Sequence, residues 1–343
     1  MAVLLVRADA NAEIGAGHAM RCLALAEAWL LAGGRVEFVS AFAAPAIERR
    51  ARERGIAFHR LSTEPGSGND AQQSIELARS LSPAAVVLDG YVFGYPYQLA
   101  LKRAGLKVLC IDDYGHAGDY CADIVLNQNL WATDRMYERR EAHTSLLLGA
   151  RYILLRREFL DAGAPDREIR GLARRILVTL GGGDAHNVAT KIVEALAHLE
   201  MNGIETIVVA GPTNPHVALL RGAIDRSGLP IELLEETESM SKLMAWADLA
   251  VSAAGSTCWE LAVMGLPALV VVTAENQEPC AVSLERMGIV RSLGRYQNLD
   301  VERVSDAIRA LLQSPEERTS MSSHGRELVD GRGAERVVAA LGG

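Results

Sequence analysis

The sequence lacks the features that mark several large protein classes. Its five cysteines are odd in number and scattered, without a Cys-x-x-Cys pair, which argues against a disulfide framework and against a zinc site. No apolar run approaches the length of a membrane span, and the N-terminus has no basic start followed by an apolar stretch. We therefore expect a cytoplasmic protein with reduced thiols and no stable membrane insertion.

A basic excess and a metal-binding motif are missing as well. The chain has 35 Lys and Arg residues against 43 Asp and Glu, a net charge of -8, whereas proteins that bind a nucleic-acid backbone normally show a basic domain or stripe. We therefore expect no nucleic-acid partner. The acidic pair Asp112 and Asp113 is contiguous, unlike the Asp-x-Asp of metal-dependent transferases, so we expect no metal and no other cofactor.

Length and the order of apolar segments predict two α/β domains. A chain of 343 residues exceeds the usual size of one core, and short apolar strands alternate with helical stretches, as in a parallel sheet covered on both faces. We predict two tandem doubly wound Rossmann-like domains, and a monomer or weak dimer. The expected parts are an N-terminal domain over 1–160, a linker over 161–173, a C-terminal domain over 174–325 and a C-terminal helix over 326–343. The expected strands are 3–6, 36–40, 85–89, 107–112 and 124–126, then 174–180, 205–210, 249–252 and 268–273.

The most informative stretch is a glycine-rich turn between the first strand and the first helix. It contains Gly15, Gly17, His18 and Arg21 and leads into a helical run. Unpaired N–H groups at a helix start attract anions, and a histidine that titrates near neutrality can take a proton. The turn therefore predicts anion binding combined with acid–base chemistry. The competing interpretation is a capping histidine without chemistry.

A dinucleotide site fits this turn poorly. The third glycine of Gly-x-Gly-x-x-Gly is absent after Gly17. The second strand ends in Ser40, where an acidic residue would hold the ribose of a dinucleotide. We therefore do not expect a nicotinamide cofactor.

Two more glycine-rich turns follow strands in the second half. The run Gly181–Gly183 precedes a helix and predicts an anion or substrate loop, with a tight turn without ligand as the alternative. Gly255 is followed by Ser256 and Thr257, hydroxyl donors suited to a diphosphate, and Glu260 one turn later can accept both hydroxyls of a ribose. Thr257 and Glu260 also satisfy a capping box, the alternative interpretation. A polar cluster suited to a sugar follows another strand, at Glu275, Asn276 and Gln277.

These elements together resemble the nucleotide-sugar hydrolases of the pseudaminic acid pathway and the related spore-coat polysaccharide proteins. Those hydrolases release UDP from UDP-2,4-diacetamido-2,4,6-trideoxy-β-L-altropyranose. The resemblance covers almost the whole chain, and its Gly-x-Gly-His-x-x-Arg and Gly-Ser-Thr-x-Trp-Glu elements are together fairly specific. It rests on residues 7–9, 15–22, 111–113, 127–129, 148–159, 181–184, 254–260 and 275–277.

The resemblance implies a glycosyltransferase B-type (GT-B) fold whose C-terminal domain holds UDP, with the terminal helix packed back on the first domain. His18 then acts as general base on a water that attacks the anomeric carbon opposite the leaving UDP, with inversion. We expect Asp9 or Asp113 to orient the imidazole or the water, and the sequence does not choose between them. Arg7, Arg21 and Tyr91 are expected to line the sugar pocket, with a structural ion pair on its helix as the alternative for Arg21. The expected substrate-binding residues are Arg7, Asp9, Gly17, Arg21, Tyr91, Asp113, Gly182, Gly255, Ser256, Thr257, Glu260, Glu275, Asn276 and Gln277.

Other functions remain open at this point. The first is an inverting transferase that delivers the sugar to an acceptor hydroxyl, for which 42–54 is the one candidate membrane-facing patch. The second is a nucleotide-sugar binding module without catalysis, which the presence of His18 disfavours. The third is a glycine-rich α/β protein with unrelated chemistry. Gly90 stands where the family pattern leads us to expect a larger residue, and the loop 182–184 is one of several variants, so the sugar preference can differ.

Overall fold

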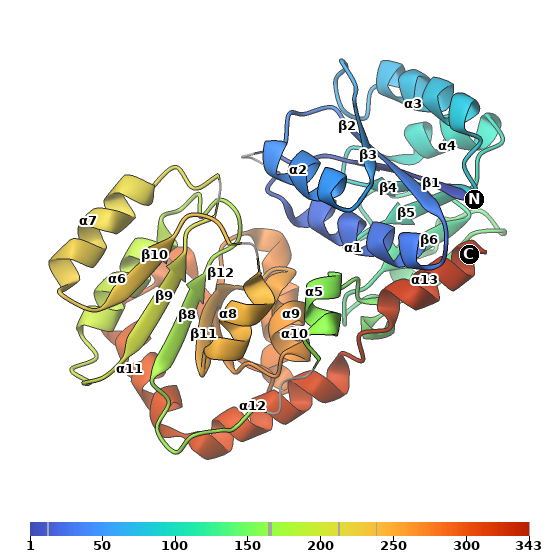
Figure 1. Cartoon of the computed structure of the whole chain (residues 1–343). Coiled ribbons are helices and arrows are strands. Elements are labelled where there is room, and N and C mark those ends of the chain that lie inside the picture. Colours follow the sequence, from blue (N-terminus) through green and yellow to red (C-terminus); the bar gives the residue numbers. More distant parts are fainter. Residues whose placement is uncertain (12–13, 164–166, 212, 238, 343) are drawn as a thin grey trace. The chain divides into compact units, whose positions relative to one another are not determined.

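The computed structural model describes residues 1–11, 14–163, 167–211, 213–237 and 239–342. The chain forms two compact units (Figure 1). Unit 1 comprises Met1–Arg157 together with Gly331–Gly343, and unit 2 comprises Glu158–Asp330. The segment 161–173, expected as a linker, therefore falls within unit 2. None of the helices in the described part of the chain is long and apolar enough to cross a membrane.

Unit 1 contains a seven-stranded sheet in the order β3-β2-β1-β4-β5-β6-β7, and all its neighbouring strands pair in parallel. Its strands are β1 Val3–Ala8, β2 Arg35–Ser40, β3 Ala57–Arg60, β4 Ala85–Asp89, β5 Val108–Ile111, β6 Ile124–Asn127 and β7 Ser145–Leu148. Its α-helices are α1 Gly17–Leu31, α2 Pro45–Glu53, α3 Gly68–Leu81, α4 Tyr95–Arg103 and α13 Gly333–Leu341. The helix α5, Arg157–Asp161, begins at the boundary between the units.

Alternation along the strands explains why both faces of this sheet are covered. Leu4 and Val6 of β1 pack into a cluster with α1, α2 and α13, whereas Leu5 packs into a second cluster with α3 and α4. Successive side chains of a strand point to opposite faces, so a continuous apolar run feeds both clusters. The helix α13 lies against α1 (Figure 1) and adds Val337 and Leu341 to the first cluster.

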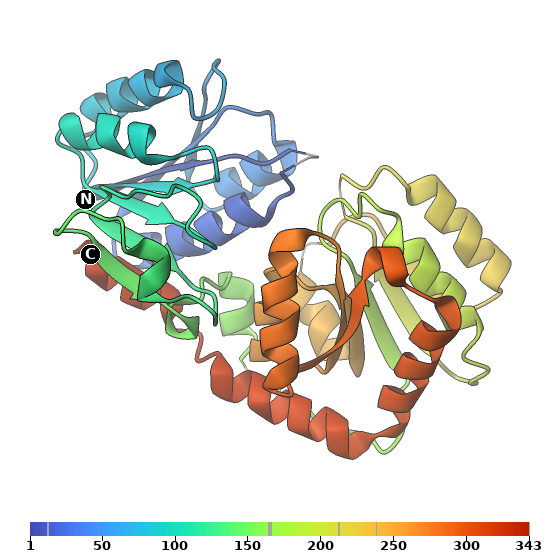
Figure 2. The ribbon, with the colours of Figure 1, turned by 180° about the vertical axis from the view of Figure 1, so that it is seen from behind.

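Unit 2 repeats the plan with a six-stranded parallel sheet in the order β10-β9-β8-β11-β12-β13. Its strands are β8 Arg175–Thr179, β9 Glu205–Val209, β10 Ile231–Leu234, β11 Leu249–Ala253, β12 Ala268–Val272 and β13 Val290–Arg295. Its remaining helices are α6 Val188–Ala197, α7 Val217–Ser227, α8 Met240–Trp246, α9 Thr257–Val263, α10 Glu278–Arg286, α11 Val301–Gln313 and α12 Pro315–Leu328. The long helix α12 packs against α9 and is seen from behind in Figure 2. The two doubly wound parallel sheets confirm the predicted fold class.

The strand order of unit 1 determines where its polar residues gather. Because β1, β4 and β5 are neighbours and parallel, their carboxyl ends lie together at one edge of the sheet. Asp9 follows β1, Asp89 ends β4, and Asp112 and Asp113 follow β5. The helix α1, which carries His18 in its first turn, begins at this same edge after the turn that leaves β1.

Candidate functional site

His18 forms an acid–histidine pair with Asp89. Its Nδ1 lies 2.7 Å from Oδ1 of Asp89, which is fully buried at the end of β4. A carboxylate can only accept a hydrogen bond, so Nδ1–H donates and the neutral ring keeps its lone pair on Nε2. Among the residues that the structure describes, Nε2 has no hydrogen-bond partner. The pair therefore prepares Nε2 to accept a proton.

Arg21, one turn after His18 on α1, holds the carboxylate of this pair in place. Its Nε donates to Oδ2 of Asp89 at 2.6 Å and its Nη2 donates to Oδ1 at 2.7 Å. The same guanidinium also bridges to Asp113, with Nη1 to Oδ1 at 2.8 Å and Nη2 to Oδ2 at 3.0 Å. One arginine thus fixes two carboxylates, which is the geometry of bidentate charge-assisted hydrogen bonds.

The charges of this cluster keep both carboxylates ionised. Burial alone would raise the pKa of Asp89, but the positive charge of Arg21 and the neighbouring His18 hold that pKa below its ordinary value. The same opposition lowers the pKa of Asp113, where Asn129 adds a hydrogen bond to the carboxylate. An ionised carboxylate beside Nδ1 can stabilise the positive charge that the ring gains when Nε2 takes up a proton.

Tyr91 closes one side of His18. Its ring stands edge-on to the imidazole, with ring centroids 4.9 Å apart, and its hydroxyl donates to Oδ2 of Asp113 at 2.9 Å. A glycine suits the turn before Tyr91 for two reasons. The φ of Gly90 is +152°, which residues with a side chain rarely adopt, and a Cβ at this position would lie 3.0 Å from the Phe93 ring. The larger residue expected after Asp89 would be strained in this backbone.

The expectation that Asp9 or Asp113 assists the histidine is wrong for the contact with His18. Asp89 makes that contact, and Asp113 reaches it only through Arg21. Asp9 instead accepts hydrogen bonds from Ser40 Oγ at 3.0 Å and from a backbone N–H. A sequence signal for Asp89 did exist: it ends an apolar run, and a doubly wound order places that strand beside β1.

Arg7 is also placed differently from the expected lining of a sugar pocket. Its side chain is fully buried, and its Nε and Nη2 donate to both carboxylate oxygens of Asp70, at 3.0 and 2.8 Å. Its Nη1 lies 2.7 Å from Asp9 in a second ion pair. Because an uncompensated buried charge is strongly destabilising, these pairs give Arg7 and Asp9 a structural function inside unit 1.

Asp112, the first residue of the acidic pair, supports the loop after β5. Asp112 accepts hydrogen bonds from the backbone N–H groups of Tyr114 and Gly115, at 2.7 and 2.6 Å. Nδ1 of His116 lies 2.6 Å from Oδ2 of the same carboxylate, and the Tyr120 hydroxyl donates to it. The loop that carries Asp113 is thereby fixed to the sheet, and Asp113 keeps its place beside Arg21.

In unit 2, the loop after β8 is closely packed. The carbonyl of Gly182 accepts hydrogen bonds from the backbone and the hydroxyl of Thr213, at 3.0 and 2.6 Å. Asp184 accepts from the N–H groups of Val188 and Ala189 and so caps α6. Burial raises the pKa of Asp184 despite these bonds. The carbonyl of Gly182 is thus already engaged within the protein.

The two polar turns expected to bind UDP and the sugar meet at Gly255. The Gln277 Oε1 accepts from the backbone and hydroxyl of Thr273, at 2.9 and 3.0 Å, and its Nε2 lies 3.6 Å from where a Cβ on Gly255 would be. The capping-box interpretation is wrong: Ser256, not Thr257, is the N-cap of α9, and it makes no side-chain cap. Neither hydroxyl has a hydrogen-bond partner among the described residues. Both remain available as donors.

The other predicted residues lie as follows. Gly17 is the exposed first residue of α1, and the half-buried Glu260 lies in the first turn of α9. Glu275 and Asn276 are exposed in a short 3-10 turn after β12. In the described part of the chain, no three His, Cys, Asp or Glu side chains are grouped in a way that could hold a metal ion.

Comparison with known proteins agrees with this architecture. Residues 175–335 match the model of the Glycosyltransferase family 28 C-terminal domain. The crystal structure of Acinetobacter baumannii MurG superposes with a TM-score of 0.68 at 18% identity, covering 100% of this chain and 99% of that one. The chain has the GT-B fold. This confirms the fold that the sequence motifs implied.

Two curated relatives extend the likeness to sequence. The spore coat polysaccharide biosynthesis protein SpsG of Bacillus subtilis is 27% identical over 254 residues, which cover 73% of this chain and 74% of that protein. A Helicobacter pylori protein is 26% identical over 226 residues, 64% of this chain and 40% of its own length. It is named pseudaminic acid cytidylyltransferase and UDP-2,4-diacetamido-2,4,6-trideoxy-beta-L-altropyranose hydrolase. The matches support a nucleotide-sugar-using enzyme with the GT-B fold.

Proposed function

We propose that the protein is a UDP-sugar hydrolase that releases UDP from a UDP-linked diacetamido-trideoxy sugar. The observation that carries this proposal is the His18–Asp89 pair, in which the neutral ring presents Nε2 as a proton acceptor. The hydrolase name of the Helicobacter relative supports the choice of reaction and of sugar. Water is the nucleophile, and the anomeric configuration inverts.

The pair supplies general base catalysis. Nε2 of His18 takes a proton from water as the oxygen attacks the anomeric carbon, and the Asp89 carboxylate stabilises the imidazolium that forms. Such a positioned base contributes roughly 10²- to 10⁴-fold to a rate. Arg21 keeps the Asp89 carboxylate in position, because it donates one hydrogen bond to each carboxylate oxygen and so prevents the group from rotating away from His18.

The leaving group needs its negative charge held more than it needs a proton, because a nucleoside diphosphate is a weak base. We assign this function to the backbone at Gly255 and to the hydroxyls of Ser256 and Thr257, with Glu260 accepting from the ribose. The Nε2 group of Gln277, beside Gly255, is a further donor in the same place.

In the same proposal, Asp113 and Tyr91 recognise the sugar. Asp113 keeps 16% of its side chain exposed although it is fixed by Arg21 and Asn129, so its position is set before a ligand arrives. A fixed carboxylate can accept from a sugar hydroxyl or an acetamido N–H. The edge of Tyr91 beside His18 gives an apolar surface for a deoxy carbon.

The test combines the protein with UDP-2,4-diacetamido-2,4,6-trideoxy-β-L-altropyranose in the presence of a chelator. Phosphorus NMR follows UDP, and proton NMR follows the anomeric signal of the free sugar. We expect UDP release with inversion, lost in His18→Ala. A matched control is His59→Ala, which removes a histidine that also pairs with a carboxylate, Glu37, at 2.6 Å but lies on β3. Equal UDP release by the wild type and His18→Ala would contradict the proposed base.

The second candidate is an inverting glycosyltransferase, supported by the likeness to MurG in fold and by the family 28 domain. In that reaction the same Nε2 takes its proton from an acceptor hydroxyl instead of water. The two functions differ in one measurable respect: a hydrolase releases UDP without an added acceptor. A protein that binds UDP but leaves the sugar nucleotide intact until an acceptor is added is a transferase.

A further inference from the structure

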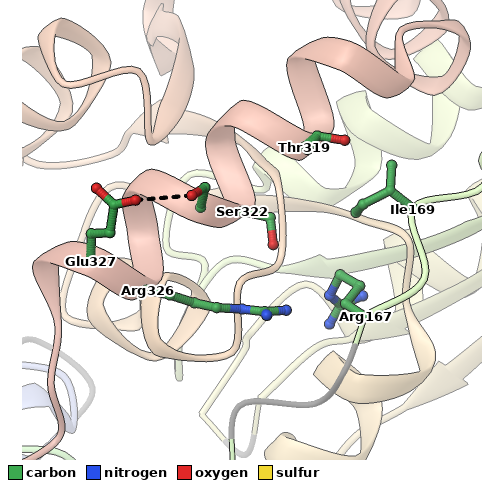
Figure 3. Close-up of a pocket in the computed structure, with 7 residues that line it drawn as sticks. Arg167, Ile169, Thr319, Ser322, Arg326 and Glu327 are labelled. Carbon is green, nitrogen blue, oxygen red and sulfur yellow. Dashed lines mark hydrogen bonds between the residues drawn. The ribbon is translucent and has the colours of Figure 1, made fainter.

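Unit 2 contains a pocket of about 350 Å³ between the segment after α5 and the helix α12 (Figure 3). None of its residues belongs to the loops to which we assign UDP. A volume of this size lies within the range of small-molecule sites. The lining residues are Arg167, Ile169, Thr319, Ser322, Ser323, Arg326 and Glu327.

Two guanidinium groups meet in this pocket. In Figure 3 the side chain of Arg326 extends from α12 toward Arg167. Burial and the charge of Arg326 lower the pKa of Arg167 to about 10, although Asp248 acts in the opposite direction. Arg167 therefore remains charged at neutral pH, and the two like charges repel each other. A bound anion would relieve this repulsion.

Two carboxylates near the pocket, Glu327 and Asp248, make hydrogen bonds to groups other than the two arginines. Glu327 accepts a hydrogen bond from Ser323 Oγ at 3.0 Å and lies away from the two arginines in Figure 3. Asp248 accepts from the backbone N–H groups of residues 174 and 175, at 2.9 and 3.0 Å. The pocket thus combines two arginines with hydroxyl groups, and Glu327, the one carboxylate among its described lining residues, lies to the side.

Arg167 is held in one orientation but is not fully satisfied. Its Nη1 and Nη2 donate to the carbonyls of Ala247, which follows α8, and of Met244, in the last turn of α8, and this fixes the plane of the guanidinium. Its Nε is buried without a hydrogen-bond partner among the described residues. A buried donor without a partner costs about 1–3 kcal/mol. The group retains unused hydrogen-bonding capacity.

The turn after α9 is shaped around the same side chains. Gly265 has a φ of +57°, and a Cβ there would collide with Nε of Arg326 and come within 2.7 Å of Ser322 Oγ. A glycine at this position therefore leaves room for both groups at the wall of the pocket. Ser322 Oγ has no hydrogen-bond partner in the described part of the chain.

We propose that this pocket binds a phosphate group, as inorganic phosphate or as the phosphomonoester of a small metabolite. The ligand is held by Arg167 and Arg326, with the Ser322 hydroxyl as a third donor. Planar guanidinium groups match the oxygens of a phosphate, and a dianion compensates two positive charges. Phosphate binding in this pocket does not depend on the proposed hydrolysis, so each proposal can be tested without the other.

The test is calorimetric titration of inorganic phosphate into the full protein in a buffer low in chloride. We expect saturable binding that Arg326→Gln weakens by about tenfold or more and Ser322→Ala by a smaller factor. Arg303→Gln, the same charge change at an exposed arginine of α11, leaves binding unchanged. If Arg326→Gln does not fold, Ser322→Ala decides.

A second measurement locates the bound phosphate. In the 15N-arginine NMR spectrum, the Nε–H signal of Arg167 shifts as phosphate is added to the wild type. Two results overturn the proposal: no binding heat at millimolar phosphate, or binding that Ser322→Ala and Arg326→Gln leave intact while Ser256→Ala removes it. The second result would place the phosphate at the start of α9.

Discussion

Replacing Asp89 by Asn tests the central pair with little change of shape. The substitution removes the negative charge of the carboxylate. That carboxylate lies 2.7 Å from Nδ1 of His18 and accepts hydrogen bonds from Nε and Nη2 of Arg21 at 2.6 and 2.7 Å. The Asn amide can present an N–H toward the ring, which favours the tautomer with the proton on Nε2. That tautomer has no lone pair where the base needs one.

The expected size of the effect follows from these contacts. A hydrogen bond to a charged group contributes about 1.5–3 kcal/mol, which corresponds to roughly 10- to 150-fold in rate if the contact acts in the transition state. The wrong tautomer extends the loss toward about 10⁴-fold. We therefore expect kcat for UDP release to fall by roughly 10²- to 10⁴-fold while KM changes little, because the carboxylate is buried and does not touch the substrate.

The assay is initial-rate UDP release by Asp89→Asn, with circular dichroism and thermal unfolding to confirm that the variant is folded. Asp113→Asn is the matched control, since it removes a carboxylate from the other side of Arg21 and leaves the His18 contact intact. We expect that variant to raise KM more than it lowers kcat. A folded Asp89→Asn with kcat within about threefold of the wild type would refute the assignment of the pair.

Three further predictions follow from the same structure. Because the folded-state pKa values of Asp89 and Asp113 are lowered, the unfolded chain binds more protons as the pH falls below about 4, so the free energy of unfolding decreases there. Urea titrations at several pH values should show a weaker acid loss in Asp89→Asn, and parallel curves would contradict the linkage. Gly90→Ala should lower the free energy of unfolding by about 1–3 kcal/mol because of the positive φ and the contact with Phe93, and unchanged stability in urea would contradict this. Ser256→Ala should weaken UDP binding about tenfold by calorimetry, and an unaltered Kd would remove this hydroxyl from the proposed site.

The sequence predicts the central strands better than the edge strands. The expected segments at 3–6, 85–89 and 249–252 correspond to β1, β4 and β11, which are buried on both faces and therefore appear as continuous apolar runs. The strands without a counterpart among the expected ones are β3, β7, β10 and β13. All four lie at sheet edges, and their partly exposed residues mix polar and apolar side chains.

The sequence predicts the histidine of the candidate site but not Asp89, the carboxylate that contacts it. The glycine-rich turn pointed to His18 because local sequence places it at a helix start. Asp89 lies 71 residues away and reaches the histidine only through the neighbouring position of β1 and β4. The prediction for Arg7 was wrong for the converse reason. Arg7 is near the turn in sequence, but its side chain lies on the face of the sheet where it donates hydrogen bonds to Asp70 of α3.

The position of α13 has a consequence for how unit 1 is made. Ala334, Val337, Val338 and Leu341 complete a cluster whose other members come from the first 154 residues, while all of unit 2 lies between them in the sequence. During synthesis, the α1 side of that core stays uncovered until about 170 further residues have been added. All residues of unit 2 are therefore synthesised before the last residues of unit 1, so unit 2 can complete its fold first although it comes second in the sequence.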